Sequence, residues 1–257
     1  MKPLLGSRVL GSFINAVSWD EAIAVIHRWA GKRESRYVCI CNVHSVVTAR
    51  SNGEFSKVIK EADMCTPDGA PIAWMLRRLG FPAQERISGP DLMLRYCAHA
   101  ERIGESIFLY GGRMETLLLL EQRLNEDFPA LRIAGLHSPP FRNLTEDEDR
   151  QVVEKINNSG AGTVWVGLGC PKQERWMAEH RGTIKAVMIG VGAAFDYHAG
   201  TLRRAPIWMQ RNGLEWLHRL CSEPSRLWKR YLLTNTLFLG LALSQLIRRG
   251  TPTRPTT

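Results

Sequence analysis

The chain has 257 residues, 44% of them hydrophobic and 23% charged, which is typical of a globular protein with one large domain or one domain and an appendage. Its start lacks the apolar stretch of a secretory leader, so we expect a cytoplasmic protein. Of the net charge of +9, +8 lies in residues 201–257, where ten Arg or Lys face two Glu. We therefore expect a nearly neutral core over 1–200 and a basic appendage over 201–257.

Strand-like and helix-like segments alternate along the core. The first helix is predicted to begin after Ser18, because Ser18 and Glu21 form a capping box before an amphipathic segment. Buried strands are predicted at 37–41, 107–110, 163–168 and 186–191, with a weaker one at 131–136. Further helices are expected over 71–79, from a second capping box at Thr145, and from Pro171 to about Arg181. This alternation predicts an α/β fold with a Rossmann-like, mostly parallel sheet and helices on both faces.

The loops that follow these strands carry residues suited to phosphate, and ligands of parallel sheets bind beyond the carboxyl ends of the strands. Glycine lets backbone N–H groups approach a phosphate closely, and a helix start adds a favourable partial charge. The candidates are Gly111, Gly112, Gly167, Gly169 and Lys172. Each glycine taken singly is also what a tight turn needs. Together they predict a nucleotide pocket, although the chain has neither a complete GxGxxG fingerprint nor a P-loop.

Two acidic residues in such loops have two interpretations each. Asp68, in the sequence Thr-Pro-Asp-Gly, is either the cap or turn residue of the next helix or a carboxylate that takes a proton from a hydroxyl at the mouth of the pocket. Asp196, after the strand at 186–191, is either a ligand-binding residue or an anchor for its own loop. The residues alone favour the cap for Asp68 and leave Asp196 open.

Metal and disulfide chemistry are not predicted. Asp147 and Asp149 form a DxD pattern, but they lie in the first turn of a predicted helix, where acidic side chains suit the helix dipole. His44 and His198 have no Cys or His partner at a ligand spacing, so structural hydrogen bonds are expected for them. The six cysteines lack a CxxC spacing and are predicted to be free thiols.

The appendage combines basic residues with aromatic ones and ends in an apolar run over 232–247. This mixture predicts binding to a membrane surface with phosphate-bearing lipid. Nucleic acid and a basic helix that packs on its own domain are the alternatives. The 17 residues between the flanking Arg230 and Arg248 cover about 26 Å of helix, less than the roughly 30 Å of a hydrocarbon core. Surface attachment is therefore expected instead of a transmembrane span.

Taken in order, several segments resemble the WecG/TagA/CpsF family of bacterial glycosyltransferases. They are TPDGAPIAW (66–74), ERISGPDL (85–92), FLYGG (108–112), VGLGCPKQERW (166–176), GVGAAFDYHAGTLRRAPIW (190–208) and GLEWLHRLCSEPSRLWKRYL (213–232). Each motif is weak, but their serial order over about residues 35–232 is specific. The resemblance implies an inverting, metal-independent enzyme without a cofactor. It would move a hexose or N-acetylhexosamine, such as glucose or N-acetylmannosamine, from a UDP-sugar to a sugar on undecaprenyl diphosphate for an envelope polysaccharide.

The resemblance also implies roles for individual residues. Asp68 corresponds to the proposed base of the family, Asn42 to the asparagine that lines the pocket, and Gln173 to the glutamine of the PKQE segment. The arginine-rich appendage is implied to close over the active site at the membrane. One position departs from the family, because Ile40 stands where the family has a threonine two residues before the asparagine. This change removes a hydroxyl from the implied pocket.

Arginines are the candidates for holding the leaving diphosphate, because a guanidinium group can grip two phosphate oxygens at once. Arg219, Arg226 and Arg230 are spaced to share one helical face if their segment is a continuous helix. Pairing with nearby glutamates or with lipid headgroups is the alternative. Arg86 is a further candidate, although the glutamate before it allows a surface role.

Two other function classes stay open from the residues alone. A Rossmann-type nucleotide-dependent oxidoreductase requires a dinucleotide fingerprint that the chain lacks. A nucleic-acid-binding module would leave the glycine loops and acids of the core without a role. We expect the partners to be a UDP-sugar, an undecaprenyl-diphosphate-linked sugar and the inner face of the cell membrane, with no nucleic acid. Association into a homo-oligomer stays open.

Overall fold

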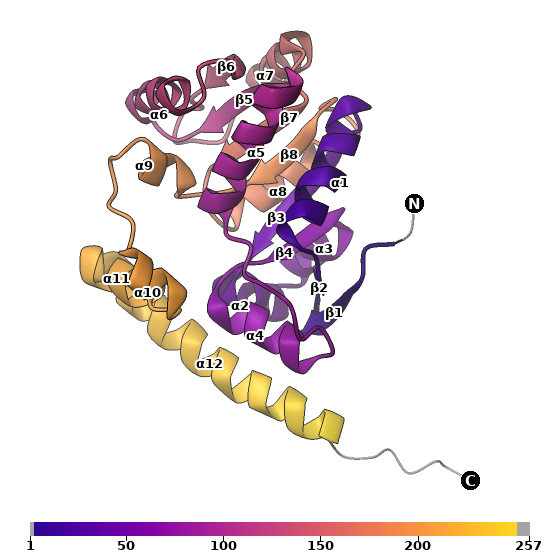
Figure 1. The fold of residues 1–257 in the computed structure, drawn as a ribbon, viewed down its shortest axis with the longest axis vertical. Coiled ribbons are helices and arrows are strands. Elements are labelled where there is room, and N and C mark those ends of the chain that lie inside the picture. The colour runs from indigo at the N-terminus through magenta and orange to yellow at the C-terminus, as the bar shows by residue number, and fades with distance from the viewer. Residues whose placement is uncertain (1–2, 251–257) are drawn as a thin grey trace.

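A computed structural model describes residues 3–250, except for the side chains of Arg226, Arg230 and 248–250. Figure 1 shows a central sheet surrounded by helices, with a long C-terminal helix running along one side of the molecule. The core and the appendage each contribute a different part of the candidate site.

The core is a six-stranded parallel sheet. In spatial order its strands are β4 (Met64–Pro67), β3 (Arg36–Cys41), β8 (Val187–Gly190), β7 (Thr163–Gly167), β5 (Ser106–Gly111) and β6 (Arg132–His137). The five predicted strands are confirmed. The edge strand β4 and an antiparallel hairpin of β1 (Gly6–Val9) and β2 (Ser12–Asn15) are additions that the sequence patterns do not predict.

Helices cover both faces of the sheet, which confirms the predicted α/β class. One face packs against α1 (Trp19–Gly31), α5 (Gly89–Ile103) and α6 (Met114–Asp127). The other face, with the hairpin, packs against α2 (Val43–Ser51), α3 (Gly53–Glu61), α4 (Ala70–Arg78), α7 (Glu146–Ser159) and α8 (Lys172–Glu179). Within β3, Tyr37 and Cys39 enter one apolar cluster, whereas Val38 and Ile40 enter the other. Burial on both faces explains why the strands are continuous apolar runs.

The predicted helix starts are confirmed where a side chain caps the helix. The Ser18 hydroxyl accepts the Glu21 N–H at 3.2 Å, and the Glu21 carboxylate accepts the Ser18 N–H at 2.8 Å. Thr145 begins α7 with the same reciprocal pair. The helix α8 differs slightly from expectation, because it begins at Lys172 and Pro171 precedes it.

The order of the strands locates a crevice at the carboxyl end of the sheet. From β5 the chain continues to β6 on one side, whereas from the adjacent β7 it continues to β8 on the other side. Such a reversal is where ligands bind in open parallel sheets. Gly111 and Gly167 are paired there, and a Cβ atom at Gly111 would lie 2.8 Å from the Gly167 carbonyl carbon. Only glycine allows the two backbones to approach so closely.

The appendage consists of α10 (Ile207–Arg211), α11 (Glu215–Ser222) and α12 (Pro224–Gly250), which follow the short helix α9 (Ala194–His198) of the core. The condition for one helical face shared by Arg219, Arg226 and Arg230 is not met for Arg219, because α11 ends before α12 begins, whereas the other two stand four residues apart in α12. Proline disfavours the helical conformation in the residue before it, and Glu223 accordingly leaves the helix with φ −132° and ψ 58°.

One face of α12 packs on the core. Phe238 and Ala242 are buried in the same apolar cluster as α2 and the hairpin. The Gln245 amide also bridges the hairpin turn, accepting the Leu10 N–H at 2.9 Å and donating to the Arg8 carbonyl at 2.6 Å. The alternative that this helix packs on its own domain is therefore confirmed for one of its faces.

The opposite face of α12 is exposed and apolar. Its exposed residues include Trp228, Leu232, Leu233, Leu239, Leu243 and Ile247. Among residues 3–250, no helix is both long and apolar enough to cross a bilayer. The helix thus has one apolar face against the core and a second one open to the surroundings.

Candidate active site

Asp68 and Asn42 lie at the carboxyl ends of the neighbouring strands β4 and β3. Ile40 pairs with Thr66 in the sheet, and side chains two residues further along each strand point to the same face. The Asp68 N–H donates to the Cys41 carbonyl at 2.9 Å, which continues the pairing by one step. The backbone of the sheet therefore brings these two predicted site residues together.

The Asp68 side chain does not cap α4. Gly69 is the capping residue, at φ +79°, and no side chain accepts a hydrogen bond at this helix start. Instead, Asp68 Oδ1 accepts the N–H of Gly69 at 2.7 Å, within the turn itself. The cap, which the residues alone favour, is thus wrong, whereas the turn contact that belongs to the same interpretation is present. The second carboxylate oxygen takes no part in the helix start.

The environment of Asp68 raises the pKa of its carboxyl to about 6. Burial is the main cause, and the nearby Glu215 carboxylate adds to it. Arg86 and hydrogen bonds from Gly69 and Asn42 act in the opposite direction. A carboxyl with such a pKa is ionised at neutral pH and still basic enough to accept a proton from a hydroxyl.

Asn42 has a second contact that fixes its orientation. Its Oδ1 accepts the Ser45 N–H at 3.2 Å and thereby caps α2, and the Ser45 hydroxyl accepts the Asn42 N–H at 3.5 Å. Its side chain also hydrogen-bonds the Asp68 carboxylate. The asparagine is therefore a rigid neighbour of the candidate base.

The glycine loop after β7 is held from behind by Gln173. Gln173 is buried, its Oε1 accepts the Gly169 N–H at 3.1 Å, and its Nε2 donates to Glu174 at 2.9 Å. Burial raises the pKa of the Glu174 carboxyl. Lys172 is exposed at the start of α8. The structure thus places Gln173 as a support for the loop, while Gly169 and Lys172 face outward.

A cavity of about 760 Å³ lies beyond the ends of β5 and β6. Arg113, Ser138, Asp196, Leu202 and Glu223 are among the residues that line it. The Asp196 carboxylate accepts a hydrogen bond from the Thr201 hydroxyl at 3.4 Å, so it both anchors its loop and faces the cavity. The neighbouring Gly112 adopts φ +72°, and its carbonyl accepts a hydrogen bond from Ser138 at 2.7 Å.

A smaller cavity of about 400 Å³ lies at the opposite, amino-terminal end of the strands, between Trp29, Arg36 and Asp63. Arg36 pairs with Asp63 there at 2.7 Å. The glycine loops and Asp68 are all at the other end of the sheet, so we place the candidate site at the carboxyl end.

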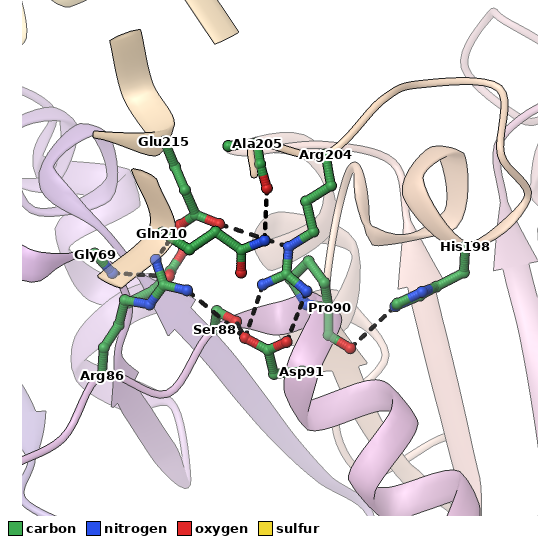
Figure 2. Close-up of polar contacts among 11 residues, drawn as sticks. Gly69, Arg86, Ser88, Pro90, Asp91, His198, Arg204, Ala205, Gln210 and Glu215 are labelled. Atoms are coloured by element: carbon green, nitrogen blue, oxygen red, sulfur yellow. Dashed lines mark hydrogen bonds and ion pairs between the residues drawn. The ribbon is translucent and has the colours of Figure 1, made fainter. Parts of the chain in front are cut away.

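Four charged residues join the appendage to the site (Figure 2). Arg86 pairs with Glu215, the first residue of α11, and its other amino group lies 3.6 Å from Asp91 in the first turn of α5. Arg204, in the loop before α10, grips Asp91 with both terminal nitrogens at 2.6 and 2.8 Å. Its Nε lies 3.5 Å from Glu215. The predicted residue Arg86 is thus near Asp68, but it is already paired with an acidic residue of the appendage.

Arg204 and Asp91 are absent from the sequence-based candidates. Both stand in segments that carry the resemblance, 190–208 and 85–92, and this is the one signal that could have pointed to them. The bidentate pairing across 113 residues of chain follows from the tertiary structure alone.

The three appendage arginines of the prediction have different positions. The Arg219 guanidinium carbon lies 5.9 Å from the centre of the Tyr197 ring, and its Nε is buried without a hydrogen-bond partner in the described part of the chain. Arg226 and Arg230 belong to α12, and their side chains lie outside the described residues. The structure therefore places only Arg219 relative to the site.

The residues set aside as structural have structural contacts. Asp147 pairs with Arg150, and the Asp149 carboxylate lies 3.0 Å from His180 Nε2, both in the first turn of α7. His198 Nε2 lies 3.0 Å from the Pro90 carbonyl oxygen. All six cysteines are free thiols. Within residues 3–250, no three His, Cys, Asp or Glu side chains gather as a metal site would require.

Comparison with known proteins decides the family. A model of the glycosyl transferase family WecG/TagA/CpsF matches residues 7–252. The chain belongs to this family. This glycosyltransferase is 31% identical over 202 residues to an N-acetylglucosaminyldiphosphoundecaprenol N-acetyl-beta-D-mannosaminyltransferase of Bacillus spizizenii, across 78% of the chain and 76% of that relative. An enzyme of the same name from Bacillus subtilis is 31% identical over 192 residues, across 74% and 73% of the two chains.

Proposed function

We propose that this glycosyltransferase transfers N-acetylmannosamine from UDP to N-acetylglucosaminyl-diphosphoundecaprenol, with inversion at the anomeric carbon and without a metal ion. The names of the two Bacillus relatives support the sugar and the acceptor. The single observation that supports the chemistry is the Asp68 carboxyl at the carboxyl end of β4, with a pKa raised to about 6.

The reaction needs one proton acceptor and one leaving group. Asp68 takes the proton of the acceptor hydroxyl while the hydroxyl oxygen forms a bond to the anomeric carbon. The bond from that carbon to the diphosphate breaks, and its electron pair leaves with UDP. Attack from the face opposite UDP converts an α-linked nucleotide sugar into a β-linked product. The word "beta" in the names of the relatives agrees with this outcome.

Side chains and backbone groups stabilise the leaving diphosphate in this proposal. Arg86 lies near Asp68, Arg219 lies over Tyr197, and the glycine backbone at Gly111 and Gly167 is at the carboxyl end of the sheet. Fixed donors and cations of this kind can meet the charge that develops in the transition state. We assign Arg226, Arg230, Asn42, Gly112, Gly167, Lys172, Gln173 and Asp196 to substrate binding or to its support.

We also propose that the exposed apolar face of α12 lies on the membrane surface. Its Trp228, Leu232 and Leu243 side chains are exposed, and Lys229 stands among them. Apolar residues with aromatic and basic neighbours are typical of helices that lie in the interface. The undecaprenyl chain of the acceptor stays in the bilayer, so this attachment would bring the crevice to the acceptor diphosphate.

Replacing the candidate base tests the proposal. Asp68→Asn in the full chain is expected to lower turnover of UDP-N-acetylmannosamine with the lipid-linked acceptor by about 10²- to 10⁴-fold. Because the amide keeps the shape of the side chain, UDP binding measured by calorimetry should change less than about twofold. Asp147→Asn is the matched control, since Asp147 is exposed in the first turn of α7.

The pH profile distinguishes a base from a turn residue. Only the ionised carboxylate accepts a proton, so wild-type turnover should rise about tenfold per pH unit below pH 6 and level off above it. A chelator should leave turnover unchanged. An Asp68→Asn variant with more than a tenth of wild-type turnover would show that the base lies elsewhere, and loss of activity in the chelator would overturn the metal-free step.

A further inference from the structure

Three arginines, Arg86, Arg204 and Arg219, lie where the appendage contacts the core, and the Nε donors of two of them lack a well-formed hydrogen bond. Arg204 gives both terminal nitrogens to Asp91, but its Nε is buried and has no hydrogen-bond partner among residues 3–250. The Nε of Arg219 is in the same situation. Buried donors without a partner cost free energy, so their presence calls for an acceptor that binds there.

Glu215 is the carboxylate nearest to these groups. It pairs with Arg86 through one oxygen, and its other oxygen lies 3.5 Å from Arg204 Nε, at the outer limit of hydrogen-bond distance. Tyr197, under the Arg219 guanidinium, is within electrostatic range of both Glu215 and Arg204. The Glu215 carboxylate therefore lies between Arg86 and Arg204, with Arg219 on the other side of the shared neighbour Tyr197.

We infer that Glu215 occupies the position of the donor diphosphate and that an incoming diphosphate displaces it from Arg86 and Arg204. This inference rests on the proposed UDP-sugar donor. Carboxylates and phosphates accept the same paired hydrogen bonds from guanidinium, so one can replace the other. Arg204 thereby becomes a phosphate-binding residue, with Arg219 as its neighbour.

The charges favour such an exchange. Arg86 and Arg204 carry two positive charges, and Asp91 and Glu215 carry two negative ones, so the paired network is neutral. When the Glu215 carboxylate leaves, the remaining three residues have a net charge of +1. These four residues thus neutralise one another in pairs, and Arg86 and Arg204 outnumber Asp91 once an anion takes the place of the Glu215 carboxylate.

The exchange requires only a side-chain movement. The backbone before α11 is held against the start of α4, because a Cβ atom at Gly213 would lie 2.7 Å from the Ala70 Cβ. Glu215 stands two residues later as the first residue of α11, and its side chain is 29% exposed. Rotation of this side chain toward solvent frees Arg86 without undocking the appendage.

Removing the charge of Glu215 tests the inference. In the full chain, Glu215→Gln is expected to tighten binding of both UDP and inorganic pyrophosphate by about tenfold at low salt, because the diphosphate no longer competes with a carboxylate. Uridine, which has no phosphate, should bind with unchanged affinity. Glu85→Gln is the matched control, since Glu85 is an exposed acidic residue next to Arg86.

A second variant tests the Nε–H donor of Arg204. Arg204→Lys keeps the positive charge but lacks the Nε–H and the paired geometry, so pyrophosphate affinity should fall at least fivefold. Thermal unfolding of each variant shows whether it is folded before binding is measured.

The outcomes separate this inference from the proposed function. UDP that binds wild type and Glu215→Gln equally, or weaker binding by Glu215→Gln, overturns the exchange and leaves the UDP-sugar donor standing. Tighter pyrophosphate binding by Glu215→Gln, with no preference for UDP in any variant, supports the exchange but rejects the proposed donor. A chain that binds neither anion in any variant overturns both.

Discussion

The two sides of the candidate site are held by different kinds of contact. On the core side, Asp68 and Asn42 are fixed by the sheet, through the Asp68 N–H bond to Cys41 and the Asn42 cap of α2. On the appendage side, Arg204 and Glu215 reach the site through ion pairs between segments far apart in the chain. Backbone contacts fix a position, whereas ion pairs can exchange one anion for another. In the proposed mechanism the proton acceptor is therefore preorganised, whereas the proposed anion-binding side can change partners.

The largest loss in the free energy of unfolding is expected where the backbone geometry is most restrictive. Gly111→Ala would introduce a Cβ 2.8 Å from the Gly167 backbone at φ +112°, so we expect a loss of about 3 kcal/mol in the free energy of unfolding. UDP binding should fall with it. Chemical denaturation and calorimetry measure both quantities.

Gly169→Ala is the matched control for this prediction. Gly169 also has a positive φ, of +78°, but a Cβ atom there meets nothing within 4 Å. Only the backbone strain of about 1 kcal/mol is then expected. Equal losses in the two variants would mean that the close approach of β5 and β7 does not determine the crevice.

The contrast between local backbone structure and contacts between distant segments also explains which parts of the fold the sequence predicts. The strands β3, β5, β7 and β8 are buried on both faces, so each is a continuous apolar run that can be recognised without a partner. The edge strand β4 has four residues and ends at Pro67, so its sequence pattern is too short to be recognised as a strand. The hairpin turn places Leu10 at φ +51°, an unusual residue for that conformation, and the turn is held by Gln245 of α12. No local pattern signals such a turn.

The residues of the candidate site also differ in whether the sequence can predict their positions. Asp68 and Asn42 follow predicted or adjacent strands, and a rule for parallel sheets is enough to place them at one edge. The pairing of Arg204 with Asp91 depends on how the loop after α9 folds back, which neither periodicity nor spacing encodes. The continuous helix that would align Arg219 with Arg226 and Arg230 fails because Pro224 interrupts it.

The next largest loss of stability is expected when the contact between α12 and the core is weakened. Phe238 is buried on the core-facing side of α12, so Phe238→Ala should cost about 3 kcal/mol and uncouple the helix from the core. Turnover of lipid-linked acceptor should fall more than UDP binding, because the arginine side of the site loses its support. Denaturation and a vesicle-based assay measure these effects.

The neighbouring Leu239→Ala separates docking from membrane attachment. Leu239 is 68% exposed, so this variant should keep its stability within about 0.5 kcal/mol. It should nevertheless bind vesicles of anionic lipid more weakly, because apolar area is lost from the proposed membrane face. Unchanged vesicle binding by Leu239→Ala and by a variant with several exposed leucines replaced would contradict the membrane role of α12.

The smallest changes in stability and activity are expected from Ile40, on the side of the site that the sheet holds. Ile40 is buried on β3 beside Thr66, whose hydroxyl is buried and has no hydrogen-bond partner in the described part of the chain. Ile40→Thr restores the hydroxyl that the family has at this position and gives Thr66 a partner, so the cost should stay near 1 kcal/mol. Because position 40 points to the same face as Asn42, the ratio of kcat/KM between UDP-sugars should shift, by less than about tenfold.

Val38→Thr tests whether this shift comes from the position or from the hydroxyl alone. Val38 points to the same face of β3 but lies two residues deeper in the core, where it packs near Met64. It should therefore lose at least as much stability as Ile40→Thr and leave the ratio between sugars unchanged. A shift in Val38→Thr equal to that in Ile40→Thr would mean that the sheet transmits the change, and Ile40 would then have no special place beside the sugar. A shift confined to Ile40→Thr would place sugar discrimination on the backbone-held side, away from the arginines proposed to hold the diphosphate.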